Sequence, residues 1–596
     1  MRVCCVLCWV LLCCGRVLAV PQEVAGAGDL PTVAEASGYQ ATSTSEEVLI
    51  FLRACDERSE HVRMFEFGRT EQGRLMSGLV IADPPVADPG QLSSLGQGRL
   101  VVMLLGNIHS GECDGKEALL MLARELALTP DHPWLQRAVI VVVPNYNADG
   151  NDQMSVDNRP GQVGPVRGMG RRETSRGFDL NRDFVKLETA EGRALVRLID
   201  QWNPHLFIDC HTTNGSVHRY PLTYDIPHNP AVAGGLREFL REEFIPEVTQ
   251  RMQTAGVETF YYGNFARQYS RWESFGFEPR YSTEYLGIRG RIGILSESYS
   301  YADYRTRVLA SREFVRQCVE ASLSRADQIS RLLGAIEESA VSVAGSELPL
   351  NAVLGPFEQK VTVLGRVPGT EEPRDYEVEY WGRYEATKRV TVPVAYVLPE
   401  ADPEVVRNLR NHGVRLMVLQ RAVRVPVVVR RVVSLERSAM AFQQHHLVQL
   451  QTEDVREERE LGAGAVIVRT SQPLGRLASW LLEPESSDGL VTWKFFAERL
   501  REGGEYPVFS VTGEVDWLLE PLAGEELSVF SFQFFLRVFA SSRLRVRNSD
   551  ADRWRGQRGG WGLSGETPLF SIPAVDSMGL AAALLSTCLH SVRGLS

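Results

Sequence analysis

Short apolar runs alternate with helical patterns in the first half of the chain. Strand-like runs occupy residues 101–105, 138–143 and 206–209, and amphipathic stretches occupy residues 113–126 and 188–202. This alternation is typical of an α/β domain, in which helices cover both faces of one sheet. Residues 311–336 repeat apolar positions at helical spacing, so we expect one helix there that closes the domain.

The pattern changes after residue 345. Residues 360–364 and 376–380 alternate apolar and polar positions, residues 425–433 are rich in β-branched side chains, and residues 402–412 form a short amphipathic pattern. Alternation and β-branching favour strands. We therefore expect a smaller, β-rich second domain of α/β or α+β class over residues 345–510, followed by a C-terminal extension over residues 511–596.

The N-terminus has the pattern of an export signal. A short positive start and an apolar stretch precede Val17-Leu-Ala19, a small-residue cleavage pattern. The apolar stretch is shorter than the ~20 residues of a membrane-spanning helix. We expect a signal peptide over residues 1–19, a lead over 20–40 and a first domain over 41–337, in a secreted or periplasmic protein whose mature chain has no transmembrane helix.

Composition narrows the possible partners. The chain has 596 residues, of which 44% are hydrophobic and 23% charged, as expected for a globular protein of more than one domain. Its net charge of -11 argues against nucleic acid as a partner, because a nucleic-acid footprint is basic.

Three potential metal ligands follow apolar runs. His109 and Glu112 lie after the run at 101–105, and His211 lies after the run at 206–209. Two ligands from one loop and a third from a distant strand suit a catalytic zinc, which keeps its fourth position open for water. Open α/β sheets place their sites at such strand ends.

Several short motifs carry a resemblance to a known family. The chain resembles the zinc carboxypeptidases of the carboxypeptidase A type, the M14 family, over about residues 40–335. The motifs are Gly106-Asn-Ile-His-Ser-Gly-Glu112, Pro144-Asn-Tyr-Asn-Ala-Asp-Gly150, Asp179-Leu-Asn-Arg182, Asp209-Cys-His211 and Ile294-Leu-Ser-Glu297. The resemblance implies a mixed sheet flanked by helices, one zinc ion per chain, and peptide or protein C-termini as substrates.

The resemblance also implies roles for single residues. His109, Glu112 and His211 would bind the zinc ion, and Glu297 would be the general base. An uncoordinated carboxylate beside an activated water suits that role, because burial can raise its pKa towards the working pH.

Recognition of a chain end requires further groups. The resemblance assigns Arg182 to the terminal carboxylate of the substrate, which its planar guanidinium can bind in a bidentate manner. Asn181 would hold the same carboxylate. An arginine that stabilises the oxyanion is expected upstream, where Arg171, Arg172 and Arg176 are candidates, and we favour Arg172.

A tyrosine that closes over the substrate is expected upstream of Glu297, although the spacing here differs from that of the family. Tyr281 and Tyr285 are candidates, as is the pair Tyr261-Tyr262, and we favour Tyr281.

Five cysteines remain after the expected signal peptide. Cys55, Cys113, Cys210, Cys318 and Cys588 form an odd, widely spread set, which is not a disulfide framework. Cys113 and Cys210 each adjoin a candidate zinc ligand, so a disulfide, two buried thiols and a coincidence of spacing are all compatible with the sequence. The pair His445-His446 is more typical of a polar turn than of a second metal site.

These patterns favour an exported zinc metallocarboxypeptidase. Two alternatives stay open at this level. One is a zinc amidohydrolase of N-acyl amino acids, which also cleaves an amide beside a carboxylate. The other is a non-catalytic peptide- or glycan-binding protein on the same fold, and the presence of Glu297 argues against it.

Overall fold

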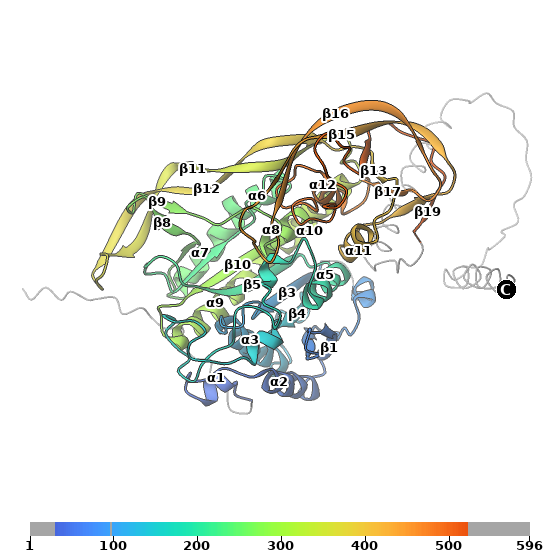
Figure 1. Ribbon diagram of the computed structural model, residues 1–596. Coiled ribbons are helices and arrows are strands. Elements are labelled where there is room, and N and C mark those ends of the chain that lie inside the picture. Colours follow the sequence, from blue (N-terminus) through green and yellow to red (C-terminus); the bar gives the residue numbers. More distant parts are fainter. Residues whose placement is uncertain (1–29, 96–97, 523–596) are drawn as a thin grey trace, which may run out of the picture. The chain divides into compact units, whose positions relative to one another are not determined.

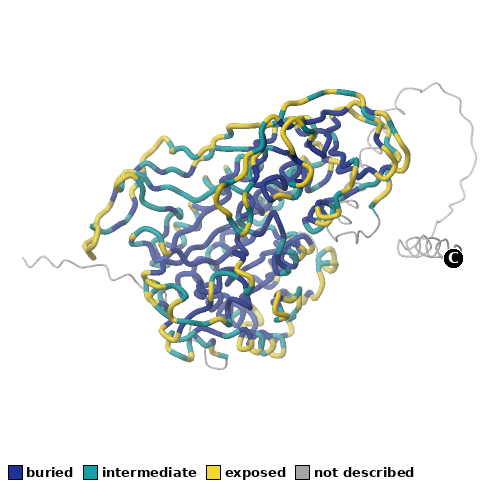
Figure 2. The backbone as a smooth tube through the Cα atoms, in the orientation of Figure 1, coloured by how far each residue is buried: buried dark blue, intermediate teal, exposed yellow. Residues whose placement is uncertain are grey.

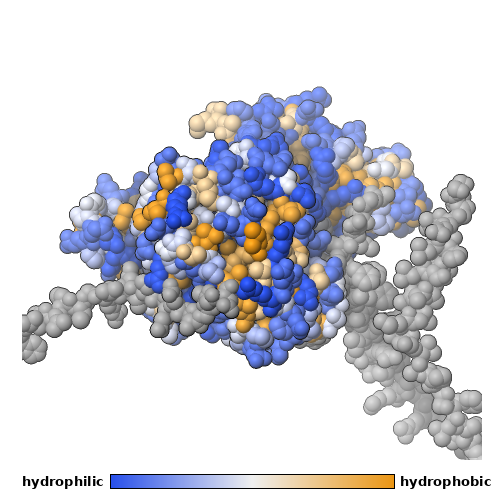
Figure 3. All heavy atoms as spheres, turned by 90° about the horizontal axis from the view of Figure 1, so that it is seen from below, coloured by the Kyte–Doolittle hydropathy of each residue, from blue (hydrophilic) through white to orange (hydrophobic). Residues whose placement is uncertain are grey.

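The computed structural model describes residues 30–95 and 98–522. These residues lie within one compact unit, Met1–Gln533. The expected signal peptide, Cys588 and most of the C-terminal extension lie outside the described residues. Among the residues described, no helix is both long and apolar enough to cross a bilayer. The face shown in Figure 3 has hydrophobic side chains in scattered groups among hydrophilic ones.

The first region of the chain forms a mixed sheet, as predicted. Its strands follow the order β1-β2-β4-β3-β5-β10-β6-β7. The central strands β4, β3, β5 and β10 are parallel, and antiparallel pairs flank them. The strands are β1 (Val62–Arg69), β2 (Leu75–Ile81), β3 (Leu100–Gly106), β4 (Ala138–Val143), β5 (Leu206–Thr213), β6 (Leu222–Asp225), β7 (Thr259–Tyr261) and β10 (Ile292–Tyr299).

Helices cover both faces of this sheet, and the core lies between them (Figures 1 and 2). Successive side chains of a strand point to opposite faces. In β5, Asp209 and His211 therefore face the side of α8 (Ser282–Ile288), where the Ser282 hydroxyl donates to Asp209. Cys210 faces the side of α3 (Asp114–Leu128). The other helices of this region include α2 (Ser45–Arg58), α5 (Ala190–Trp202) and α7 (Ile245–Thr254).

Helix α3 lies very close to β5. A Cβ atom at Gly115 would lie 2.3 Å from the Cβ atom of Cys210, so only glycine fits there. Cys113 and Cys210 are both buried and unpaired, as are Cys55 and Cys318. The structure thus decides for buried thiols and against a disulfide between Cys113 and Cys210. Burial raises the pKa of Cys113 to about 11, so its thiol stays protonated at neutral pH.

The prediction of one helix over residues 311–336 is wrong. Two helices, α9 (Tyr304–Ser324) and α10 (Ala326–Ala340), meet at Arg325, whose backbone leaves the helical region with φ -112° and ψ 19°. The guanidinium of Arg325 forms ion pairs with Glu243 and Glu247 near α7. Helical spacing continues across the break, so the pattern alone does not reveal it.

The second region is β-rich, as predicted. β11 (Glu347–Arg366) and β12 (Pro373–Thr391) form a long hairpin, and β12 pairs with β9 (Arg271–Glu273) of the first region. A separate seven-stranded sheet follows the order β16-β15-β18-β13-β17-β14-β19. Its strands are β13 (Ala395–Leu398), β14 (Met417–Leu419), β15 (Val423–Arg437), β16 (Val448–Leu461), β17 (Val466–Arg469), β18 (Phe509–Val511) and β19 (Leu519–Pro521).

The predicted amphipathic helix is α11 (Pro403–Asn411), and the residue after it joins the two regions. The buried ring of His412 accepts a hydrogen bond from the Tyr285 hydroxyl at Nδ1 (2.8 Å) and donates from Nε2 to the carbonyl of Val185 (3.0 Å). Nε2 can donate in either protonation state, but Nδ1 can accept from the Tyr285 hydroxyl only while the imidazole is neutral. Burial lowers the pKa of His412 to about 3.

His412 should therefore make folding acid-sensitive. Between pH 6.5 and 3 the unfolded chain binds a proton at His412 and the folded chain does not, so stability falls as the pH falls. The variant His412→Gln keeps a donor and an acceptor but does not titrate. Between pH 7.5 and 5, the free energy of unfolding should fall by about 2 kcal/mol more for the unchanged chain than for this variant. Urea unfolding at both pH values measures this, with exposed His446→Gln as the control. Equal losses for the unchanged chain and His412→Gln would contradict the assignment.

Candidate metal centre

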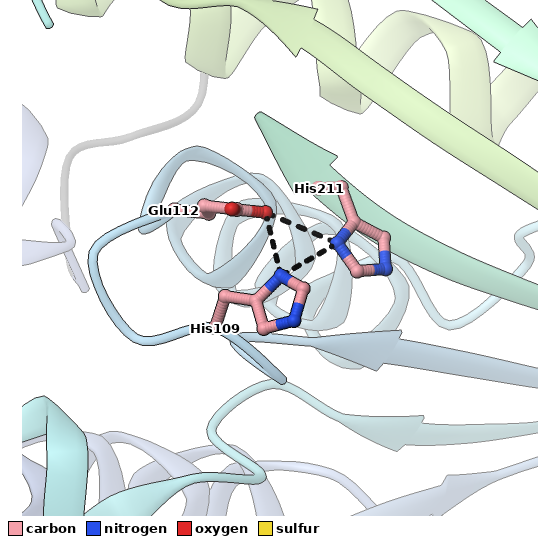
Figure 4. Close-up of side chains that lie close together, drawn as sticks. All are labelled: His109, Glu112 and His211. Carbon is pink, nitrogen blue, oxygen red and sulfur yellow. Dashed lines mark hydrogen bonds and ion pairs between the residues drawn. The ribbon is translucent and has the colours of Figure 1, made fainter. Parts of the chain in front are cut away.

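The three predicted ligands come together at one end of the sheet (Figure 4). Nδ1 of His109 and Nδ1 of His211 are 3.1 Å apart, and Oε2 of Glu112 lies 3.2 and 3.0 Å from them, respectively. All three residues are buried. Two imidazole nitrogens and one carboxylate oxygen form a donor set that fits zinc.

The fold explains why these side chains meet. The parallel pair β3 and β5 brings the loop after β3, with His109 and Glu112, beside the end of β5. His211 is paired in register with Glu297 of β10, and each lies two residues before the end of its strand. The candidate general base is thus held beside the ligands by the backbone hydrogen bonds of the sheet.

The outer nitrogens of both imidazoles face carboxylates. Nε2 of His109 lies 2.8 Å from Oδ1 of Asp179, and Nε2 of His211 lies 2.9 Å from Oδ2 of Asp209. A carboxylate at this position accepts the proton of Nε2, which leaves the lone pair of Nδ1 free for a metal. Asp179 and Asp209 were part of the motifs that marked the site, although no role was predicted for them.

The charges around the ligands favour a cation at the centre. Burial opposes ionisation of Glu112, but the charges of His109 and Arg159 hold its pKa well below the ordinary value. Burial likewise opposes protonation of His211, but the charge of Asp209 raises its pKa well above the ordinary value. Glu112 is therefore ionised, and Asp209 favours positive charge at His211, as a bound zinc ion would supply.

The second oxygen of Glu112 is held by two arginines. Nη1 of Arg159 and Nη1 of Arg172 donate to Oε1 at 2.8 and 3.0 Å, whereas Oε2 accepts from the backbone N–H of Thr212. Oε2 is therefore the oxygen turned towards the imidazoles. These contacts fix the orientation of the carboxylate before any metal binds.

Arg159 was not among the predicted site residues. It lies in a polar loop with no recognisable motif, and only its contact with Glu112 reveals it. The contact explains Gly111: a Cβ atom there would lie 2.5 Å from Cδ of Arg159 and 2.9 Å from the carbonyl oxygen of Gly170. A glycine between the ligands is thus required for the arginine to pack against the loop.

Among the three upstream arginines, only Arg172 lies at the site. Its Nη2 donates to Oδ2 of Asp179 at 2.8 Å, in addition to its bond to Glu112. Arg171 pairs with Glu173, and Arg176 pairs with Glu71, away from the ligands. This arrangement supports the choice of Arg172 as the oxyanion arginine.

Glu297 has the environment expected of a proton carrier. Its side chain is 8% exposed, and its Oε2 has no hydrogen-bond partner among the described residues. Burial, opposed by the charge of His211 and reinforced by that of Glu112, raises the pKa of Glu297 to about 8. A carboxyl group in this range can take up and release a proton near neutral pH.

Asn181 and Arg182 lie directly beside the ligands. Oδ1 of Asn181 accepts from the backbone N–H of Ser282 at 2.9 Å, and its Nδ2 lies 3.4 Å from Nε2 of His211. Nη1 of Arg182 donates to the Asn181 carbonyl at 2.7 Å, which uses one of its five donors. The Arg182 guanidinium lies 4.5 Å from the centre of the Tyr281 ring, so Tyr281 orients the arginine.

The other tyrosine candidates differ in their surroundings. Tyr285 is buried and bonded to His412, and Tyr261 packs against Tyr224. Tyr262 senses the carboxylates of the site. Burial raises the pKa of its hydroxyl, and the charges of Glu297 and Glu112 raise it further. Tyr262 therefore joins Tyr281 as a candidate for contact with substrate.

The pair His445-His446 does not form a second metal site. Among the described residues, the group of three or more potential ligands that could hold a metal is His109, Glu112 and His211. His445 instead bonds Glu188 (2.6 Å) and His446 bonds the carbonyl of Ser438. The predicted polar turn is the correct interpretation.

Comparison with known proteins finds similarity to zinc carboxypeptidases. Residues 48–255 match the zinc carboxypeptidase family. The chain is 22% identical to "Carboxypeptidase 2" of Trichophyton tonsurans over 467 residues, 74% of this chain and 81% of that protein. It is 34% identical to human "Carboxypeptidase D" over 165 residues, 24% of this chain and 12% of that protein. A crystal structure of a metallo-carboxypeptidase from Burkholderia cenocepacia aligns with a TM-score of 0.34 and 18% identity, over 48% of this chain and 69% of that one.

Proposed function

We propose that this chain, whose residues 48–255 match the zinc carboxypeptidase family, is an exported zinc-dependent enzyme that removes C-terminal residues from peptides. His109, Glu112 and His211 are the proposed ligands of one zinc ion. The observation that carries the proposal is the convergence of these buried ligands, buried Glu297 and half-buried Arg182 at one end of the sheet. Export rests on the sequence of residues 1–19.

Arg182 and Asn181 are the proposed binding groups for the terminal carboxylate of the substrate. The guanidinium of Arg182 is held by the Asn181 carbonyl and the Tyr281 ring, so its remaining donors have a fixed direction. A fixed fork of donors matches a carboxylate and rejects an internal peptide group, which carries no charge. This pair would restrict cleavage to the C-terminal bond.

Glu297 and Arg172 have the proposed catalytic roles. When bound, zinc lowers the pKa of a water molecule and polarises the carbonyl of the substrate. The Glu297 carboxylate takes the proton of the attacking water and later gives it to the leaving amine. Arg172, which Glu112 and Asp179 orient, donates to the oxygen on which negative charge develops.

The test is the release of amino acids from a mixed peptide library by the purified chain. We expect release from free C-termini, a much slower reaction with the same peptides amidated at the C-terminus, and loss of activity with a zinc chelator that added zinc restores. N-Acyl amino acids are tested in parallel. Hydrolysis of those compounds without trimming of peptides would favour the amidohydrolase, and zinc binding without any hydrolysis would favour a binding protein.

A further inference from the structure

The loop between β15 and β16 ends in a tight turn with unusual backbone angles. Phe442 and His445 exchange backbone hydrogen bonds of 2.8 and 2.9 Å across this turn. The two residues between them, Gln443 and Gln444, have φ values of 48° and 65°. A two-residue hairpin turn with two positive φ values favours Asn-Gly, because other residues are strained there. Two consecutive glutamines at these positions suggest that their side chains serve another purpose.

Both glutamine side chains bind the catalytic region. Oε1 of Gln443 accepts a hydrogen bond from the backbone N–H of Asp179 at 3.0 Å. Nε2 of Gln444 donates to the carbonyl of Arg176 at 3.2 Å. The turn of the β-rich region is thus bonded to the segment directly before Asp179.

Asp179 is the residue through which this contact affects the metal centre. Its Oδ1 faces Nε2 of His109 at 2.8 Å and accepts from the backbone N–H of Asn181 at 2.9 Å, and its Oδ2 accepts from Arg172. The position of the Asp179 backbone therefore sets the direction of one metal ligand, one arginine and one substrate-binding residue. Gln443, from the loop between β15 and β16, accepts the hydrogen bond of the Asp179 backbone N–H and so holds that backbone in place.

A second contact from the β-rich region supports the other side of the site. The buried carboxylate of Asp488 accepts from the backbone N–H of Arg280 at 2.7 Å and pairs with its guanidinium at 3.1 Å. Arg280 directly precedes Tyr281, whose ring lies against Arg182. Phe442, next to Gln443, lies under the same Arg280 guanidinium at 5.1 Å. The two contacts belong to one continuous surface.

We infer that Gln443 is a positioning residue of the metal centre, supplied by the β-rich region, which fixes Asp179 and through it the His109 imidazole. The inference rests on the proposed function. A merely structural turn would instead favour residues that relax the backbone. A variant that relaxes the turn and shortens the side chain at position 443 should therefore distinguish a positioning role of Gln443 from a structural role in the turn.

The experiment compares two variants with the unchanged chain. Gln444→Gly relaxes one strained position, removes the bond to the Arg176 carbonyl and keeps Gln443, so it controls for both effects in the double variant. Gln443→Asn combined with Gln444→Gly introduces the favoured turn sequence but removes one methylene from the side chain that bonds Asp179. The variants differ only at residue 443. Zinc affinity is measured on metal-free protein by competition with a chelating dye, alongside kcat, KM and the unfolding temperature without metal.

We expect the double variant to unfold at the same or a higher temperature than the unchanged chain, because its turn is relaxed. Its zinc affinity should nevertheless fall on the order of tenfold, the lower end of the effect of removing an outer partner of a metal ligand. Its kcat should fall with it, since Asp179 also orients Arg172. Gln444→Gly alone should keep the zinc affinity of the unchanged chain.

Equal zinc affinity in the two variants would overturn the inference. If the double variant does not fold, Gln443→Met is compared with the unchanged chain instead, because methionine keeps the length of the side chain and replaces the amide oxygen by a weakly accepting sulfur. Failure of the unchanged chain to bind zinc at all would instead reject the proposed function. The two failures are therefore distinguishable.

Discussion

Replacement of Glu297 by glutamine should abolish most hydrolysis while zinc remains bound. The amide keeps the shape of the carboxyl group but cannot take a proton from the attacking water, so we expect kcat to fall by roughly 10²–10⁴-fold. Glu297 is paired in register with His211 and is not one of the three clustered ligands, so the ligand set stays complete. Release of C-terminal amino acids and the zinc content of the purified variant are the measurements.

Exposed Glu338→Gln is the matched control, because it makes the same chemical change on α10. It should leave both kcat and zinc content unchanged. Full activity of Glu297→Gln would show that another group carries the proton. Loss of zinc together with activity would show that Glu297 takes part in metal binding, which the proposed roles do not allow.

Replacement of Arg182 by methionine should remove the preference for a free C-terminus. Loss of one partner of a buried charge pair costs about 2–5 kcal/mol, which corresponds to roughly 30- to 5,000-fold in kcat/KM. The loss should be confined to peptides with a free carboxylate, and the slow reaction of amidated peptides should change little. The preference is measured, for each peptide, as kcat/KM of the form with a free C-terminal carboxylate divided by kcat/KM of the amidated form.

Arg182→Lys tests the geometry of the same interaction. Lysine keeps the charge but lacks the planar fork and the stacking on Tyr281, so it should recover only part of the lost rate. Arg171→Met is the control, because Arg171 pairs with Glu173 away from the ligands. An equal loss for free and amidated peptides with Arg182→Met would assign Arg182 a structural role and contradict carboxylate recognition.

The pattern of apolar and polar residues along the chain predicts much of this fold. Strands β3, β4 and β5 are short apolar runs between amphipathic stretches, and a buried parallel strand must be apolar on both faces. Helix α11 lies within the amphipathic pattern of residues 402–412 and begins after Asp402, whose side chain accepts from the backbone N–H groups of Glu404 and Val405. The break between α9 and α10 does not follow from the pattern, because helical spacing continues across Arg325, where the backbone leaves the helical region.

The candidate site divides in the same way. The sequence by itself determined which residues are the candidate ligands, and the resemblance of its motifs predicts the general base and the carboxylate clamp. These residues lie in short motifs next to strands whose register brings them together. Only the tertiary structure decided that Arg159 holds Glu112, that Cys113 and Cys210 are separate thiols, and that Gln443 supports Asp179. The physical reason is that these contacts join side chains and backbone groups between 47 and 264 residues apart, and no local pattern of polar and apolar positions encodes such a contact.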